Sequence, residues 1–189
     1  MKLPSRSALL IIDLQNDYFN RELWPNSAMP GEAGRLVEAA NGWVKIFREK
    51  NRPILWTRQS FKPGMQDAFL HARNPEQAYC IQGTPGAELL DGLDIREEDP
   101  VLEKKRYSAF FGTPLESILA EQRIAQLYLA GITTSWCIRS TATDAYQRDL
   151  EVSLCADCLA SFTRESHEQD LAAMQGLFAS VVDRASSSP

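Results

Sequence analysis

Histidine is scarce in this sequence, whose 189 residues include only His71 and His167. We expect His71 to lie in a long loop and His167 in the last helix, so neither is placed to pair with a catalytic cysteine. They are also the only histidines that could complete a zinc site with Cys155 and Cys158, although the spacing of those cysteines is typical of metal and redox motifs. We therefore interpret Cys155 and Cys158 as packed side chains of a buried strand.

Long apolar runs and excess basic charge are also absent. The longest apolar run near the start, Ala8–Ile12, ends at Asp13 and is too short for a signal-peptide core or a membrane span. The formal net charge is −5, which makes nucleic acids and anionic membranes poor partners. Hydrophobic residues make up 44% of the chain, an ordinary globular composition. We therefore expect residues 1–189 to form a single cytoplasmic domain with free thiols.

Strand-like and helix-like segments alternate along the chain. Ala33–Lys50, for example, carries apolar residues at the spacing of one buried helix face. The alternation predicts a three-layer α/β fold with a mainly parallel sheet and helices on both faces. The expected strands are Ala8–Asp13, Pro53–Thr57, Pro100–Lys104, Ala125–Ala130 and Glu151–Cys155, and the last expected helix is Glu165–Val182. The stretch from about Arg58 to Thr84 is expected to be a long loop, and such loops are usually functional or act as lids.

Three residues with useful chemistry follow three of these strands. Asp13 ends the first strand, Lys104 ends the third, and Cys137 follows the fourth at the expected first turn of a helix. Because ligands bind beyond the carboxyl ends of parallel strands, we expect the three side chains to meet there. The helix N-terminus and the Lys104 ammonium would lower the pKa of the thiol, and Asp13 would accept its proton. Backbone N–H groups of Gly131–Cys137 would bind the oxyanion of a carbonyl substrate.

Each of these residues also has a plainer interpretation. Asp13 alone could cap a helix or anchor a loop, and Lys104 could belong to a solvated basic cluster with Lys105 and Arg106. Cys137 alone could pack as a small apolar side chain. Only their joint placement favours an enzyme that acts on a small molecule.

Three segments around these residues resemble the isochorismatase-like cysteine hydrolases. They are Leu9–Phe19 (LLIIDLQNDYF), Val101–Phe110 (VLEKKRYSAF) and Gly131–Ala142 (GITTSWCIRSTA), and Gly83–Gly86 (GTPG) extends the match over nearly the whole chain. The resemblance implies a Rossmann-like parallel sheet and a catalytic triad of Asp13, Lys104 and Cys137. It also implies a cis peptide bond between Ile132 and Thr133 and an oxyanion hole formed by the backbone N–H groups of Thr133 and Cys137. The implied reaction is hydrolysis of a C–N bond through a thioester-like acyl-enzyme.

Departures from the family pattern narrow the expected substrate. Nicotinamidases of this family bind a metal through an aspartate and histidines just after the second strand, where this chain has Trp56–Pro63 (WTRQSFKP). We therefore expect no metal, no cofactor and no nicotinamidase activity. The presence of Cys137 favours an amide, carbamoyl or ureido substrate. Tyr18, Trp56 and Phe110 are candidate substrate-binding residues, although a core role is equally compatible with each.

Two alternative functions remain open at this point. The chain could be an isochorismatase-type hydrolase of a vinyl ether, in which Cys137 is incidental, or a non-catalytic protein that keeps the fold. The resemblance also implies assembly as a homodimer or homotetramer, in which partner loops could close the pocket. The sequence does not identify the substrate.

Overall fold

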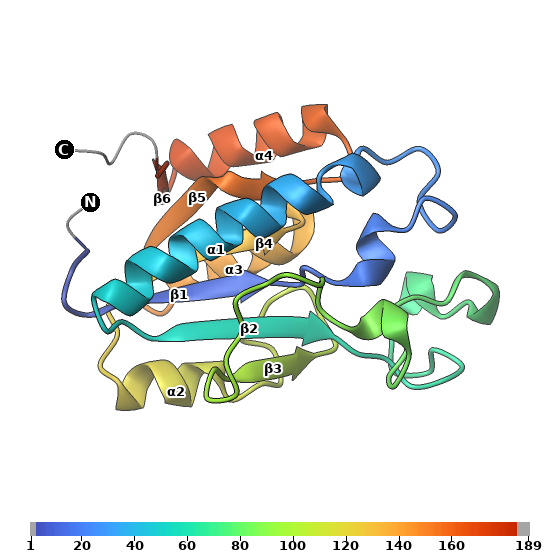
Figure 1. Ribbon diagram of the computed structural model, residues 1–189, viewed down its shortest axis with the longest axis horizontal. Coiled ribbons are helices and arrows are strands. Elements are labelled where there is room, and N and C mark those ends of the chain that lie inside the picture. Colours follow the sequence, from blue (N-terminus) through green and yellow to red (C-terminus); the bar gives the residue numbers. More distant parts are fainter. Residues whose placement is uncertain (1–2, 185–189) are drawn as a thin grey trace.

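The computed structural model describes residues 3–184 and contains a six-stranded sheet in the order β3-β2-β1-β4-β5-β6 (Figure 1). Every neighbouring pair of strands in this sheet is parallel. The strands are β1 (Ser7–Ile12), β2 (Ile54–Gln59), β3 (Val101–Lys104), β4 (Gln126–Ile132), β5 (Glu151–Ala160) and β6 (Ala179–Val182). Strand order reverses between β1 and β4, and in open parallel sheets this switch point is where ligands bind.

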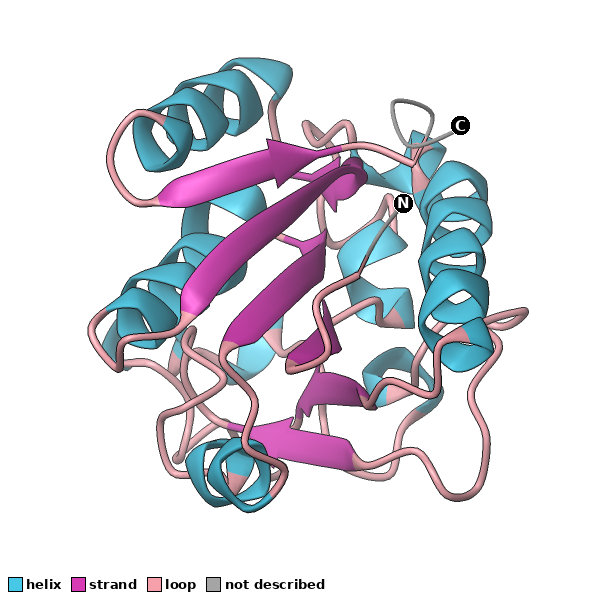
Figure 2. Ribbon diagram, turned by 90° about the vertical axis from the view of Figure 1, so that its left-hand side faces the viewer, coloured by secondary structure: helices cyan, strands magenta, loops and turns pink. Residues whose placement is uncertain are grey.

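The helices cover both faces of the sheet, as the alternation of segments predicted (Figure 2). They are α1 (Ala33–Glu49), α2 (Leu115–Glu121), α3 (Arg139–Tyr146) and α4 (Arg164–Gln175). None of the helices in the described residues is long and apolar enough to cross a membrane. The three-layer α/β architecture predicted from the sequence is therefore confirmed.

Two apolar cores lie on opposite faces of the sheet, and the alternation of side chains in β1 separates them. Leu9 and Ile11 pack in one core with side chains of α1, whereas Leu10 and Ile12 pack in the other. The second core is covered by three helices, because it also contains Leu119 of α2, Ala142 of α3 and Met174 of α4. Burial on both faces explains why β1 is a continuous apolar run.

The prediction of a last helix over Glu165–Val182 is wrong beyond Gln175. Helix α4 ends at Gln175, and the chain then forms β6, which pairs with β5 from Val152 to Cys155. Residues 180–182 (SVV) include two adjacent valines, which suit an edge strand better than a helix. The predicted tail, residues 185–189, lies outside the described residues.

The cysteine pair is part of β5, which is longer than the sequence predicted. Cys155 and Cys158 are both buried and free, and Cys158 Sγ donates to the carbonyl oxygen of Leu36 at 3.7 Å. The pairing of β4 with β5 shifts register in this part of the strand, between Leu129 and Gly131. The interpretation of these cysteines as packed side chains is confirmed.

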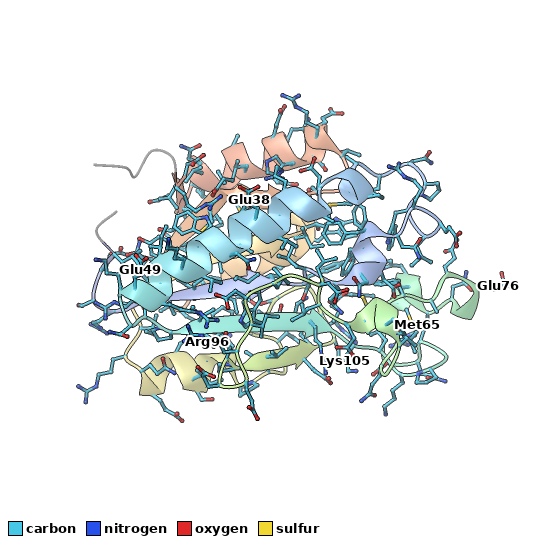
Figure 3. All side chains as sticks on the ribbon, viewed as in Figure 1. Glu38, Glu49, Met65, Glu76, Arg96 and Lys105 are labelled. Carbon is cyan, nitrogen blue, oxygen red and sulfur yellow. The ribbon has the colours of Figure 1, made fainter. Side chains whose placement is uncertain are left out.

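A long connection leads from the carboxyl end of β2 back to the start of β3, and its first part lies beyond the carboxyl end of the sheet (Figure 1). It spans residues 60–100 and contains only short 3₁₀ turns, at Leu70–Ala72, Pro75–Gln77 and Pro85–Ala87. Figure 3 shows Met65 and Lys105 beyond the carboxyl ends of β2 and β3, whereas Glu49 lies at the opposite end of the molecule. Lys105 Nζ pairs with Asp67 Oδ2 at 3.0 Å and so ties this connection to the end of β3.

Candidate active site

Asp13 lies at the carboxyl end of β1, in the middle of the sheet, and is fully buried. Its backbone adopts a left-handed φ of 54°, which aspartate tolerates better than most residues. This φ interrupts the strand alternation where β1 ends, so the carboxylate reaches the side of the sheet on which Ile12 lies. There Asp13 Oδ1 accepts a hydrogen bond of 2.8 Å from Thr57 Oγ1, and Thr57 is the residue paired with Ile12.

Cys137 lies beside Asp13 because the chain has an irregular backbone at and after the end of β4. Gly131 has a φ of 107°, and a Cβ there would lie 2.1 Å from the carbonyl oxygen of Ile12, so only glycine lets β4 approach β1 this closely. The expected cis peptide bond between Ile132 and Thr133 is confirmed. The chain then forms one π-helical turn, Thr134–Ile138. Cys137 therefore lies in a π-helical turn, and not in the first turn of an α-helix as the sequence predicted.

Lys104, the last residue of β3, contacts both of the other side chains. Its Nζ forms an ion pair of 2.6 Å with Asp13 Oδ2 and a hydrogen bond of 3.4 Å to Cys137 Sγ. It donates a further hydrogen bond of 3.0 Å to the carbonyl oxygen of Arg106. The side chains of Lys104 and Asp13 are fully buried, and Cys137 is 4% exposed. The fold thus brings together the acid, the amine and the thiol that stand far apart in the sequence.

The pKa of the thiol differs from the sequence-based expectation. Burial raises the pKa of Cys137 to about 12, while Lys104 opposes this rise and Asp13 adds to it. Burial also disfavours the charge of Lys104, but Asp13 and Cys137 outweigh it and raise the pKa of that ammonium. The expected lowering of the thiol pKa is therefore wrong, because desolvation exceeds the attraction of Lys104. At neutral pH the resting site holds a charged Lys104 beside a neutral thiol.

An aromatic rim lies at the carboxyl end of the sheet. Its eight side chains form a closed series of ring contacts, with centroids 4.1 to 6.4 Å apart. In order around the series they are Tyr18, Trp24, Phe162, Trp136, Tyr107, Phe69, Phe61 and Tyr79. They come from the segments after β1, β2, β3 and β5 and from the π-helical turn.

Three tyrosines at different points of this rim interact electrostatically with the triad. Burial is the main cause that raises the pKa of Tyr18 and of Tyr79, and the charges of Cys137 and Asp13 add to it. For Tyr107, burial and Cys137 raise the pKa whereas Lys104 lowers it. Cys137 therefore lies near enough to all three tyrosines to influence their pKa values.

The other two candidate substrate-binding residues lie elsewhere. Trp56 is fully buried, and its Nε1 lies 3.3 Å from Asp99 Oδ2, just before the start of β3. Phe110 is buried under α2, and the guanidinium of Arg148, after the end of α3, lies 4.7 Å from its ring centre. Strand alternation directs Trp56 away from the side that Thr57 faces, which the sequence motif alone does not reveal. Both residues are core side chains, and this corrects the sequence-based interpretation.

Gln59 is a candidate site residue that the sequence analysis missed. It ends β2, is in register with Lys104, and is two residues from Thr57, so these side chains share one face of the sheet. The Gln15 side chain holds the backbone of Gln59 through two hydrogen bonds of 2.7 Å. The Oε1 of Gln59 accepts a short hydrogen bond from the Tyr18 hydroxyl. Gln59 Nε2 is buried and has no hydrogen-bond partner among residues 3–184. The sequence signal that could have identified Gln59 is its position just beyond the carboxyl end of a predicted strand.

Comparison with known proteins identifies the family. The Isochorismatase domain family matches residues 7–186 of this chain. The chain belongs to the isochorismatase family. It is 33% identical over 178 residues to a probable inactive nicotinamidase of Arabidopsis thaliana, covering 90% of this chain and 89% of the relative.

Two further members of the isochorismatase family differ in length from this chain. The enterobactin synthase component B of Escherichia coli is 34% identical over 187 residues, which are 95% of this chain and 61% of that protein. A ureidoacrylate amidohydrolase of Klebsiella pneumoniae is 32% identical over 165 residues, which are 76% of this chain and 68% of that protein. This chain therefore spans only about 61% of the length of the enterobactin protein.

A solved structure of an isochorismatase family protein from Desulfovibrio vulgaris matches the fold. The TM-score is 0.86 at 26% sequence identity, and the match covers 96% of each chain. The parallel sheet and its covering helices are therefore those of the isochorismatase family.

The metal of nicotinamidases in the isochorismatase family does not fit the residues present here. At the end of β2 this chain has Gln59, whose carboxamide oxygen accepts a hydrogen bond from Tyr18, and just beyond it Phe61, whose ring packs on Phe69 and Tyr79. In the part of the chain that the structure describes, no group of three or more His, Cys, Asp or Glu side chains is arranged to hold a metal ion. The donor set required for such a metal is therefore missing at this position.

Proposed function

We propose that this protein is a cysteine hydrolase that cleaves a C–N bond of a small amide, carbamoyl or ureido compound. The observation that carries the proposal is the position of Lys104 Nζ, 2.6 Å from Asp13 Oδ2 and 3.4 Å from Cys137 Sγ. A carboxylate that can accept the thiol proton and an ammonium that stabilises the sulfur anion together suit nucleophilic catalysis by cysteine. The relative named as a ureidoacrylate amidohydrolase supports a substrate of this class.

In the proposed reaction, Asp13 takes the proton of the Cys137 thiol as Sγ attacks the carbonyl carbon of the bound substrate. The backbone N–H groups of Thr133 and Cys137 donate hydrogen bonds to the oxyanion. As the tetrahedral intermediate collapses, the C–N bond breaks and Asp13 gives its proton to the leaving nitrogen, which departs as ammonia or an amine. Lys104 stabilises the negative charge on the carboxylate and on the sulfur throughout.

The resulting thioester is then hydrolysed by the same groups. Asp13 accepts a proton from a water molecule that attacks the acyl carbon, and the C–S bond breaks. The thiolate of Cys137 recovers the proton from Asp13 and the acid product leaves. Because the resting thiol is neutral, proton transfer to Asp13 accompanies attack and does not precede substrate binding.

The surroundings of the triad favour a small substrate with a planar apolar part and further polar atoms. The aromatic rim offers flat faces against which such a molecule stacks. Gln59 Nε2 and Thr133 Oγ1 are buried and have no hydrogen-bond partner among the described residues. Since unpaired buried polar atoms are costly, we propose that polar atoms of the substrate pair with them. Tyr18 would then fix the Gln59 carboxamide and contact the substrate.

One observation favours a second candidate, the hydrolysis of a vinyl ether. The thiol of Cys137 is neutral at rest, and a reaction that needs only proton transfer by Asp13 would leave it so. In that reaction Cys137 takes no part. The remaining possibility, a non-catalytic protein, predicts that no substrate of either class is turned over.

We further propose that the chain works as one cytoplasmic domain that assembles as a homodimer or homotetramer. The match of the Isochorismatase domain family to residues 7–186 supports a single domain. Sedimentation velocity of the purified protein tests the assembly, and a monomer at micromolar concentration would contradict it.

The experiment that tests the function is a screen for ammonia or amine release across small amides, ureas and carbamoyl compounds. We expect turnover of at least one class, and rapid acid quenching followed by peptide mass spectrometry should find the acyl group on Cys137. The Gln59→Leu variant should raise KM for the best substrate by about tenfold, the loss expected for one buried hydrogen bond. No turnover of any amide, carbamoyl or ureido compound would contradict the proposal.

A further inference from the structure

His167 contacts the turn that carries the nucleophile, although the reaction proposed above does not use it. It lies in the first turn of α4 and is half-buried. Its Nδ1 is 2.8 Å from the Oγ1 of Thr134, which is the first residue of the π-helical turn and is fully buried. Helix α4 therefore reaches the turn of Cys137 through one imidazole.

The second contact of Thr134 determines the direction of this hydrogen bond. Thr134 Oγ1 donates to the carbonyl oxygen of Ala160 at 3.1 Å, at the end of β5. A hydroxyl has one proton, so both contacts are hydrogen bonds only when Oγ1 accepts from His167 and Nδ1 carries the hydrogen; this is the tautomer we assign. Burial and then Arg35 lower the pKa of His167, while Glu168 and Glu32 oppose them, so the neutral imidazole is favoured.

A second tie anchors the residue next to Thr134. Ser135 Oγ lies 2.9 Å from Ser161 Oγ, in the segment that joins β5 to α4. Two consecutive residues of the π-helical turn are thus held by the same segment of the chain. The carbonyl oxygen of Thr133, just before them, accepts from the N–H groups of Trp136 and Ile138 at 3.1 Å each. A shift of Thr134 would therefore move both ends of the turn that positions Cys137.

We propose that His167 is a positioning residue, which fixes the turn of Cys137 and the N–H of Thr133 by donating its Nδ1 proton to Thr134. This inference rests on the proposed function in so far as that turn supplies the nucleophile and the oxyanion hole. His167 does not contact the reacting atoms. It acts through the hydroxyl of Thr134, in the way that hydrogen-bonded neighbours hold catalytic groups in productive geometry.

The inference predicts which substitutions of His167 preserve turnover. Asparagine places an N–H donor close to the position of the histidine Nδ1, whereas leucine offers similar bulk without a donor. We expect His167→Leu to lower kcat by about tenfold, with KM changed by less than about twofold. His167→Asn should recover kcat to within about threefold of the original protein. Gln169→Ala, an exposed change on the same helix, is the matched control and should leave both constants unchanged.

A substitution of Thr134 tests whether His167 acts through it. Thr134→Val removes the hydroxyl at nearly constant shape, and His167→Leu should then have no further effect on kcat. Thr134→Ser keeps the hydroxyl and should leave His167→Leu as harmful as in the original protein. Circular dichroism and thermal unfolding should show that each variant is folded.

A readout without any amide substrate separates this inference from the proposed function. Alkylation of Cys137 by iodoacetamide, followed at that peptide by mass spectrometry, reports the geometry of the turn directly. We expect His167→Leu to change the alkylation rate at least about threefold and His167→Asn to restore it, even if no amide is turned over. Equal kcat and equal alkylation rates in the folded His167→Leu variant would overturn the inference. So would a His167→Asn variant no better than His167→Leu.

Discussion

The ammonium of Lys104 lies 2.6 Å from the carboxylate of Asp13, and both side chains are completely removed from solvent. Charges buried in this way are stable only when they are paired, because neither can be hydrated. Residues at the ends of β1 and β3 thus depend on each other for folding.

A double-mutant cycle should measure this dependence. Lys104→Met alone leaves the Asp13 carboxylate buried without its partner and should lower the free energy of unfolding by about 3–5 kcal/mol. The Asp13→Asn/Lys104→Met double variant removes both charges and should lose less than the single variant. Urea denaturation at neutral pH measures these losses and that of Asp13→Asn alone, and a double variant whose loss equals the sum of the two single losses would contradict the buried ion pair.

The reactivity of Cys137 should follow its raised pKa. With the pKa of the thiol at about 12, the rate of iodoacetamide alkylation should rise about tenfold per pH unit up to about pH 10, without a plateau near neutrality. Asp13→Asn removes a charge that raises this pKa and should speed alkylation at a fixed pH. Lys104→Met removes a charge that lowers it and should slow alkylation. A plateau near pH 7 would show that the thiol ionises far more easily than its burial allows.

Gly131 should be intolerant of any side chain. Gly131→Ala would place a Cβ 2.1 Å from the carbonyl oxygen of Ile12 at a φ of 107°, so we expect a loss of about 3 kcal/mol or more in urea denaturation. Gly34→Ala in α1 is the matched control, because nothing lies within 4 Å of its added Cβ. That variant should be neutral or more stable by about 0.5–1 kcal/mol. Equal stabilities of the two variants would contradict the close approach of β1 and β4.

Chelation should not affect turnover of the best amide found in the screen. Gln59 ends β2 and Phe61 follows it, and neither side chain supplies the carboxylate or imidazole that a catalytic metal needs. We expect full activity after dialysis against EDTA and no stimulation by added zinc or manganese. Loss of activity on chelation, restored by one of these ions, would contradict this account.

The sequence predicted strand β1 and helix α1 well because their patterns are local. The apolar run of β1 and the one-sided spacing in α1 each decide a structure within a single segment. The family resemblance then selected Asp13, Lys104 and Cys137. Strand β6 was missed because Val181, which pairs with β5, also fits the apolar spacing of the helix predicted over Glu165–Val182.

The surroundings of the triad were harder to predict because they depend on distant contacts. Trp56 and Phe110 looked like pocket residues, yet strand alternation and the turn after β3 direct both into the core. The thiol pKa was predicted with the wrong sign because a sequence does not reveal complete burial. His167 had no visible role until the fold placed it beside Thr134.

The most direct measurement is the turnover of the Cys137→Ala variant on the best substrate from the screen. If sulfur attack is the chemistry, kcat should fall by about a thousandfold or more, while the variant stays folded and no acyl adduct forms. Turnover within about twofold of the original protein would contradict the account, since Cys137 would then be only a neighbour of Asp13 and Lys104.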